Sequence, residues 1–329
     1  MRFSSRTVGL AAAVITVVIW TAFIVVARAS ATGAHGGTLT PFDIAFARIV
    51  GASLVLLPLG AWLVRRQRLP GWLGLSPLPF RVTAQIGVLG GLLYALLAYT
   101  GFFYAPAAHA SVLLPGSLPL WTALLAIGVL GERIGRARAL GLVLIVAGDL
   151  LVGGASLLRA FDGGEVWKGD LLFMAAAFCW SSYSVLVRRH GLDAVKATVA
   201  ITVFAALTYL PVYSALALAG VAGSHLAAAP WREIAFQALF QGVGSVVISG
   251  VTFTQMIRHF GPVKSTMITA LVPGLSALAA VVFLGEPLGW NLWAGLALVT
   301  GGIVFGVRGL ALKTPELIAN NDQSAVDKA

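Results

Sequence analysis

The sequence predicts an all-α membrane protein of ten transmembrane helices, arranged as a 5+5 inverted repeat, with its N- and C-termini in the cytoplasm. Three observations support this prediction: a composition poor in charge, ten apolar segments of membrane-spanning length, and a repeated motif. The motif is VLGERIGRARALGL at 129–142 and FLGEPLGWNLWAGL at 283–296, and its second copy lacks the arginines.

The composition suits lipid better than water. Of the 329 residues, 59% are hydrophobic and only 10% are charged, with a mean hydropathy of +0.92. A soluble domain carries roughly 25% charged residues, so this chain has too few to cover a water-facing surface. The net charge of +10 therefore fits arginine and lysine held on the cytoplasmic side of a bilayer rather than a nucleic-acid partner. The single cysteine, Cys179, excludes an internal disulfide and a cysteine metal site.

Ten segments are long and apolar enough to span a bilayer, which takes about 20 helical residues. They are 7–29, 41–64, 82–105, 107–130, 136–154, 168–189, 194–219, 232–257, 262–284 and 289–307. The ARASA sequence after the first segment resembles a signal-peptide cleavage site, which leaves a signal peptide as an alternative for that segment. We expect the polar tail 313–329 to be poorly ordered.

The distribution of positive charge predicts the orientation. With the N-terminus in the cytoplasm, 17 of the 22 lysines and arginines fall in cytoplasmic segments and four in outer segments, while Arg48 lies within a span. Cytoplasmic loops of membrane proteins carry this excess of positive charge. The same bias leads us to expect a bacterial inner-membrane location.

The second half of the chain repeats the first. With an offset of 154 positions, residues 109–148 align with 263–302 without a gap, and 13 of the 40 pairs are identical. With an offset of 160, Trp20 aligns with Trp180 and Arg28 with Arg188. Because each unit has an odd number of helices, the second must enter the membrane inverted. We therefore divide the chain into repeats 1–154 and 155–312 and the tail 313–329. The match also argues against cleavage of the first segment.

The repeated motifs resemble the drug/metabolite transporter superfamily, EamA-type, over residues 7–307. In the first repeat the resemblance rests on Pro119, Gly131-Glu132 and Gly141, and in the second on Pro273, Gly285-Glu286-Pro287 and Gly295. A small patch, Trp180-Ser181-Ser182, adds to it. It implies a secondary transporter of metabolites, amino acids or drugs, and the YddG-like exporters of aromatic amino acids are the branch that it favours. Arg133 departs from the family's proline, which is present here only as Pro287.

A polar stripe along 232–257 predicts one wall of a substrate path. Its members recur every three or four residues on one helical face: Gln237, Gln241, Ser245, Ser249, Thr252, Gln255 and His259. Facing lipid, such a stripe would be costly, so it must face protein or water. A wet cavity is the interpretation that we favour, and hydrogen bonding between packed helices is the alternative.

Aromatic side chains near the middle of spans are further cavity candidates: Trp20, Tyr94, Tyr99, Trp180 and, behind a proline, Trp121. Plain packing is the alternative for each, and also for the small-residue face of 82–105 with Gly87, Gly90, Gly91, Ala98 and Gly101. Pro115, Pro119 and Pro273 are expected to break their helices inside the membrane, where freed carbonyls could bind a substrate or serve only a packing kink.

Charged groups within the spans are few. We expect Arg48 and Asp149 to form an ion pair near the outer surface, with separate snorkelling as the alternative. Every other acidic residue lies at or near the end of a span, so no carboxylate is available at the midplane for an organic cation. This favours neutral amino acids or similar amphipathic metabolites over organic cations. Aromatic amino acids and export are what the resemblance implies, and alternating access is what the inverted repeat suits.

An enzyme is disfavoured because all five histidines fall at or near helix ends and no nucleophile or metal motif lies at depth. We expect no metal and no cofactor. The expected partners are the lipid bilayer and a small-molecule substrate, and we expect no nucleic-acid partner. A channel or a scaffold stays open as an alternative. The exact substrate, the transport direction, the coupling ion and the oligomeric state do not follow from the sequence.

Overall fold

The fold is a bundle of helices, and the computed structural model describes residues 5–31 and 37–311. The predicted tail 313–329 lies outside this described part. Within the described residues, nine segments are long and apolar enough to cross a membrane, and Trp290–Gly306 is a tenth, shorter apolar helix. All ten predicted segments are helical, which confirms the all-α membrane fold.

The first five spans are built from nine elements and a short 3₁₀ turn: α1 (Ser5–Ala31), α2 (Pro41–Gln67), α3 (Phe80–Ile86), η2 (Gly87–Leu93), α4 (Tyr94–Tyr104), α5 (Ala107–Ser111), η3 (Val112–Gly116), α6 (Leu118–Leu130), α7 (Arg136–Leu158) and η4 (Arg159–Asp162). The next five spans comprise α8 (Val166–Arg189), α9 (Ala194–Leu218), α10 (Trp231–Gln237), η5 (Ala238–Ile248), α11 (Ser249–Thr269), α12 (Val272–Leu284) and α13 (Trp290–Ala311). Gly261, with φ 77°, is the turn inside α11 between the eighth and ninth spans.

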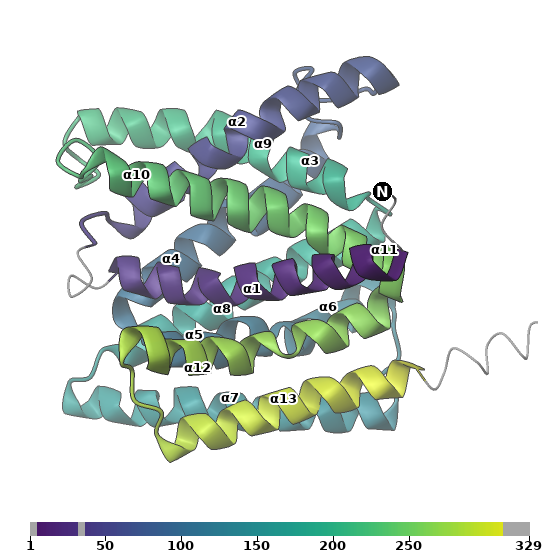
Figure 1. Ribbon diagram of the computed structural model, residues 1–329, viewed down its shortest axis with the longest axis vertical. Coiled ribbons are helices and arrows are strands. Elements are labelled where there is room, and N and C mark those ends of the chain that lie inside the picture. Colours follow the sequence, from purple (N-terminus) through teal and green to yellow (C-terminus); the bar gives the residue numbers. More distant parts are fainter. Residues whose placement is uncertain (1–4, 32–36, 312–329) are drawn as a thin grey trace, which may run out of the picture.

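Helix packing follows the repeat. In Figure 1, α7 and α13 form one edge of the bundle, whereas α2 and α9 lie at the opposite edge. Between these edges α1 packs on α11 and α12, and its counterpart α8 packs on α4 and α6. Each of these contacts recurs between the equivalent helices when the two repeats are exchanged: the contacts of α1 correspond to those of α8, and the α7–α13 and α2–α9 contacts each join equivalent spans. The structure therefore has the five-plus-five arrangement expected of an inverted repeat.

Glycines allow α7 and α13 to pack closely against each other. A Cβ atom on Gly141 would lie 2.5 Å from the carbonyl oxygen of Gly302, and one on Gly148 would lie 2.6 Å from that of Gly295. These two contacts are repeat images, because 154 positions separate Gly141 from Gly295 and Gly148 from Gly302. Only a residue without a side chain allows two helices to pack this tightly.

Four spans depart from regular α-helix at places that the repeat relates. The π-helical segment Gly87–Leu93 of the third span corresponds, 154 positions later, to 241–247, which lies within the π-helical segment Ala238–Ile248. The fourth span is interrupted at Ser117 and the ninth at Ala270 and Leu271. Such π-helical segments are frequent at functional sites.

The bundle has two ends, at which the connections between spans lie. We call the face at which α1 begins and α13 ends the terminal face, and the opposite one the far face (Figure 1). The structure does not contain a membrane, so the cytoplasmic position of the terminal face stays a prediction.

Candidate functional site

The polar stripe of the eighth span faces the bundle. Gln237 and Gln241 are almost completely buried and Ser249 is buried, whereas Leu239 and Val251, on the opposite side of the same span, are exposed. Ser245, Thr252, Gln255 and His259 are partly buried. The stripe is therefore directed at protein, as its periodicity predicts.

The two halves of this stripe differ in their hydrogen bonding. Towards the terminal face the two hydroxyls of the stripe have partners: the Ser249 hydroxyl donates to the carbonyl oxygen of Ser245 at 2.7 Å, and the Thr252 and Thr16 hydroxyls lie 2.8 Å apart. Towards the far face they are not, because both side-chain polar atoms of Gln241 and the hydroxyl of Ser245 have no partner among the described residues. Buried polar groups normally have partners, so this half of the stripe has unused hydrogen-bonding capacity.

Arg48 of α2 lies against this unsatisfied half. Its Nη1 donates to the Tyr99 hydroxyl and to the Gln241 carbonyl oxygen, both at 3.3 Å, and its guanidinium carbon lies 5.8 Å from the centre of the Phe23 ring. These contacts come from α1, α2, α4 and η5, so both repeats contribute to one polar cluster. We call Arg48, Tyr99, Gln241 and Phe23 the Arg48 cluster.

The prediction of an ion pair between Arg48 and Asp149 is wrong. Asp149 lies on α7, is 7% exposed, and neither of its carboxylate oxygens has a hydrogen-bond partner in the described part of the chain. The prediction relied on similar depth in the membrane, but depth does not bring two helices together. Here α7 packs on α13, whereas α2 packs on α9 and η5.

Four of the five candidate aromatic residues fall into three separate contacts. Tyr94 and Trp180, one from each repeat, have ring centres 4.7 Å apart. Trp20 packs on Phe253 at 5.1 Å, and Trp121 on Phe178 at 5.4 Å. The Trp121 indole nitrogen is buried and has no partner among the described residues. The structure thus places Tyr99 in the Arg48 cluster and the three tryptophans outside it.

The small-residue face of the third span serves packing. A Cβ atom on Gly87 would lie 2.5 Å from the Phe204 side chain, and one on Gly90 would lie 2.6 Å from Tyr183. Both glycines therefore receive aromatic rings from the second repeat, which is the packing alternative for this face.

The prolines lie at the helix breaks. Pro119 and Pro273 occupy the first turn of α6 and of α12, and Pro115 lies within η3. At the first of these breaks the Ser181 hydroxyl of α8 donates to the carbonyl oxygen of Leu118 at 3.2 Å. This contact joins the sixth span to the fourth at the break, and the substrate role of the freed carbonyls stays a prediction.

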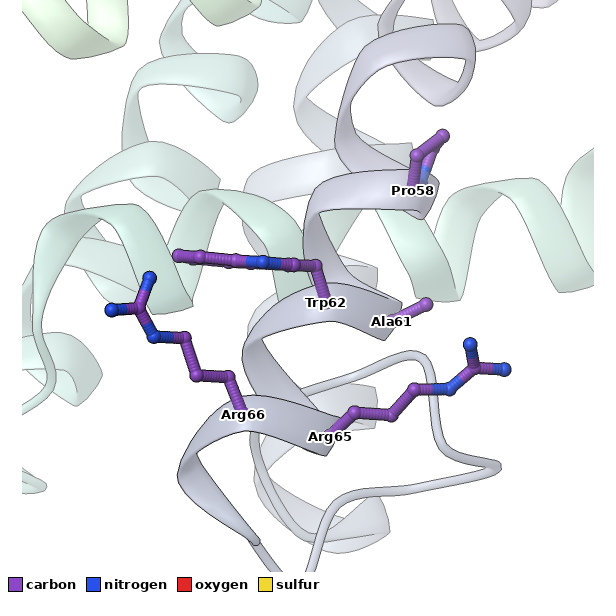
Figure 2. Close-up of a pocket in the computed structure, with 5 residues that line it drawn as sticks. All are labelled: Pro58, Ala61, Trp62, Arg65 and Arg66. Carbon is purple, nitrogen blue, oxygen red and sulfur yellow. The ribbon is translucent and has the colours of Figure 1, made fainter.

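Two hollows lie at the surface of the bundle. One of about 230 Å³ opens at the far face between α1 and α10, where Gln237 and Ser30 line it and bond to each other at 2.7 Å. Figure 2 shows a second one, of about 570 Å³, which is lined by five residues of α2 alone: Pro58, Ala61, Trp62, Arg65 and Arg66. A hollow formed by one helix cannot enclose a solute, and its tryptophan and arginines are typical of a membrane interface.

Each face of the bundle holds an ion pair that joins the two repeats. At the far face Arg28 Nε of α1 lies 3.0 Å from Glu286 Oε1, and the other Glu286 oxygen accepts from the backbone nitrogen of Ala108 at 3.3 Å. At the terminal face Glu132 pairs with Arg188 of α8, and Arg138 Nη1 lies 3.3 Å from its second oxygen. Glu132 and Glu286 are repeat counterparts, as are Arg28 and Arg188. We call these two contacts the closure pairs.

The electrostatics of the terminal closure pair favour the charged carboxylate. Partial burial raises the pKa of Glu132, but the hydrogen bonds and charges of Arg188 and Arg138 outweigh it and hold that pKa below its ordinary value. The pair is therefore formed at neutral pH.

Comparison with known proteins identifies the family. The model of the EamA-like transporter family matches the chain twice, at residues 7–154 and 167–308. This chain belongs to the EamA-like transporter family. It is a multi-pass membrane protein and a transporter of small solutes. The division at 154 and 312 that the sequence suggests remains a prediction.

This EamA protein has relatives in bacteria and plants. YyaM of Bacillus subtilis (strain 168), described as an uncharacterized transporter, is 26% identical over 220 residues, which cover 67% of this chain and 70% of YyaM. A WAT1-related protein of Arabidopsis thaliana is 26% identical over 282 residues, 82% of this chain and 78% of that protein. A crystal structure that is 24% identical, with a TM-score of 0.53, covers 93% of this chain and 96% of its own, and it shows the fold alone.

The EamA protein also has a buried polar contact that sequence reasoning missed. Asp170, only 4% exposed, accepts a hydrogen bond from Ser156 and lies 2.9 Å from His109 Nδ1. It joins the far-face ends of three spans. The sequence placed His109 and Asp170 at or near helix ends but gave no signal that pairs them. For the closure pairs a signal existed, because the offsets of 154 and 160 already related both glutamates and both arginines.

Proposed function

We propose that this EamA protein is a secondary transporter that moves small amphipathic solutes, neutral or aromatic amino acids first among them, by alternating access. We place it in a bacterial inner membrane, with the terminal face in the cytoplasm and export as its direction. The Arg48 cluster and the unsatisfied half of the polar stripe, Gln241 and Ser245, form the substrate site in this proposal.

One observation supports the mechanism above all others: the two closure pairs are images of each other under the repeat. A pair at each face joins one repeat to the other, so breaking the far pair lets the repeats separate there while the terminal pair holds, and the reverse also applies. Because the repeats are similar, the two open states are similar in energy, which is what alternating access requires.

The outer half of the eighth span supports the position of the solute. It holds buried polar atoms without partners among the described residues, and it is π-helical, so its backbone is less regular than elsewhere. From the 230 Å³ hollow at the far face, the stripe continues through Gln237 to Gln241, one helical turn deeper. This gives the solute a polar route to the Arg48 cluster.

Flux in proteoliposomes tests the proposal. Proteoliposomes preloaded with an unlabelled amino acid should take up the same amino acid in labelled form faster than proteoliposomes that are not preloaded. The uptake rate should saturate as the external concentration rises. This trans-stimulation distinguishes a carrier from a channel. Non-saturable flux without trans-stimulation would indicate a channel, and no flux of any solute in a broad panel would contradict the proposal.

A further inference from the structure

We propose that Arg48 binds the carboxylate of the transported solute, and that this solute is a monocarboxylate with an aromatic or apolar body whose amino group is dispensable. The inference rests on the proposed function, because it takes the Arg48 cluster as the substrate site. It goes beyond that function by stating which chemical group the site recognises.

The first argument is the unused bonding capacity of Arg48. Both of its hydrogen bonds leave from Nη1 and reach neutral acceptors, the Tyr99 hydroxyl and the Gln241 carbonyl oxygen. Its Nε and Nη2 atoms have no hydrogen-bond partner that the described residues supply. Nε–H and one N–H of Nη2 form the parallel donor edge of a guanidinium, which matches the two oxygens of a carboxylate.

The second argument is the missing counter-charge. No carboxylate lies within 4.0 Å of a guanidinium nitrogen of Arg48 in the described ranges, 5–31 and 37–311. Asp43, on the same helix, is already engaged by Tyr213, Ser224 and the backbone nitrogen of His225. Charged side chains within membrane spans are rare, usually paired, and mark substrate paths. An anionic solute would supply the counter-charge that the protein does not.

The third argument concerns the rest of the solute. The rings of Phe23 and Tyr99 lie with centres 6.0 Å apart beside Arg48, so the carboxylate site has an aromatic wall. Gln241, fully buried, presents an amide whose nitrogen and oxygen are both without partners in the described part of the protein. The Arg48 cluster contains no acidic side chain, and none among the described residues pairs with Arg48, so the cluster itself offers a solute ammonium no ion-pair partner. The cluster therefore selects for a carboxylate and an apolar body, with the amide as a neutral polar contact.

Ligand chemistry on the unaltered protein gives the first test. Binding to purified full-length protein in detergent would be measured by calorimetry for four compounds that share a phenyl ring: L-phenylalanine, 3-phenylpropionate, L-phenylalaninamide and phenethylamine. We expect the first two to bind, and the last two, which lack a carboxylate, to bind at least tenfold more weakly. Equal affinity for L-phenylalanine and its amide would overturn the inference, as would failure of both carboxylates to bind.

Variants of Arg48 give the second test. Arg48→Gln should weaken binding of 3-phenylpropionate at least tenfold, and Arg48→Lys less, because lysine keeps the charge but loses the parallel donor edge. The matched control is Arg66→Gln at the exposed end of the same helix, which should bind as the unaltered protein does. A folded Arg48→Gln variant with unchanged affinity would overturn the inference, and if that variant does not fold, the four-compound series decides.

Failure of this inference differs from failure of the proposed function. Binding through Arg48 without trans-stimulated flux would support the inference and contradict transport by alternating access. Trans-stimulated flux of solutes that lack a carboxylate, at the same rate in Arg48→Gln, would support transport by alternating access and contradict the inference.

Discussion

Arg28 Nε lies 3.0 Å from Glu286 Oε1, and this pair joins the first repeat to the second at the far face of the bundle. Its repeat image, Arg188 with Glu132, joins the second repeat to the first at the terminal face. The relationship explains why the Gly-Glu motif occurs twice. In each copy the glycine ends a helix in the left-handed conformation, with φ 68° at Gly131 and 66° at Gly285, and places the glutamate at the surface to meet the arginine of the other repeat.

The closure pairs should bias the protein in opposite directions. Arg28→Gln is expected to favour opening at the far face, and Arg188→Gln opening at the terminal face. A partly exposed ion pair contributes on the order of 1 kcal/mol, which changes the ratio of the two states about fivefold. With Cys179 replaced by serine, labelling of Gln237→Cys should rise in the first variant and labelling of Gln255→Cys in the second. The charge-swapped double variant, Arg28→Glu with Glu286→Arg, is the control that should restore the original pattern, and equal labelling in both single variants would contradict closure.

Acid should release the terminal closure pair. Because the folded-state pKa of Glu132 is depressed, its ion pair stabilises the closed face above the unfolded pKa of about 4.3 and is lost as pH falls through the folded value. Labelling of Gln255→Cys, divided by the labelling of a freely exposed cysteine at the same pH to correct for the thiolate fraction, should therefore be constant from neutral pH to about pH 5 and rise below that. Glu132→Gln should show high labelling at neutral pH and no acid step. An acid step of the same size in both proteins would assign it to another group.

Transport should depend on the unsatisfied half of the polar stripe. Gln241→Leu or Ser245→Leu removes polar atoms that have no partner among the described residues, so it should cost the fold little while it removes contacts to the solute. We expect flux to fall at least tenfold with a normal yield of monodisperse protein. Leu239→Ala, on the exposed side of the same span, is the matched control. Unchanged kinetics in both polar variants would remove the eighth span from the path.

Arg48 and Asp149 should act independently. Because no ion pair links them in the described structure, the stability changes of Arg48→Gln and Asp149→Asn should add within about 0.5 kcal/mol in a double-mutant cycle. Asp149→Asn alone should raise the melting temperature, since it replaces a buried carboxylate that has no partner among the described residues by a neutral amide. A coupling energy above about 1 kcal/mol would show that Arg48 and Asp149 do interact, as the sequence-based prediction holds.

The contact between α7 and α13 should tolerate glycine replacement only where space exists. Gly148→Leu should prevent folding, because even its Cβ would lie 2.6 Å from the carbonyl oxygen of Gly295. Gly154→Ala, on the same helix with no atom within 4 Å of its Cβ, should stabilise the protein by about 0.5–1 kcal/mol. Recovery of folded protein, judged by size-exclusion chromatography and thermal melting, measures both. Normal folding of Gly148→Leu would mean that the two helices are farther apart than described.

The sequence by itself determined the spans, the repeat and the polar face of the eighth span. These depend on local properties: segment length, apolar content, and the periodicity that places Gln237, Gln241 and Ser245 on one side of a helix. The two constant offsets within the chain also indicated which residues are counterparts, and an odd number of spans in each unit required the inversion.

Only the tertiary structure decided which counterparts meet and which charges stay unpaired. Arg48 and Asp149 have similar expected depth, yet their helices pack on different neighbours, so the predicted pair does not form. Tyr99 and Gln241 are 142 positions apart and contact the same guanidinium, which no local pattern encodes. Depth along a helix follows from residue spacing, whereas lateral neighbours follow from packing such as the contacts of Gly141 with Gly302 and of Gly148 with Gly295. For this reason the polar face of the eighth span was predictable from sequence, and the surroundings of Arg48 were not.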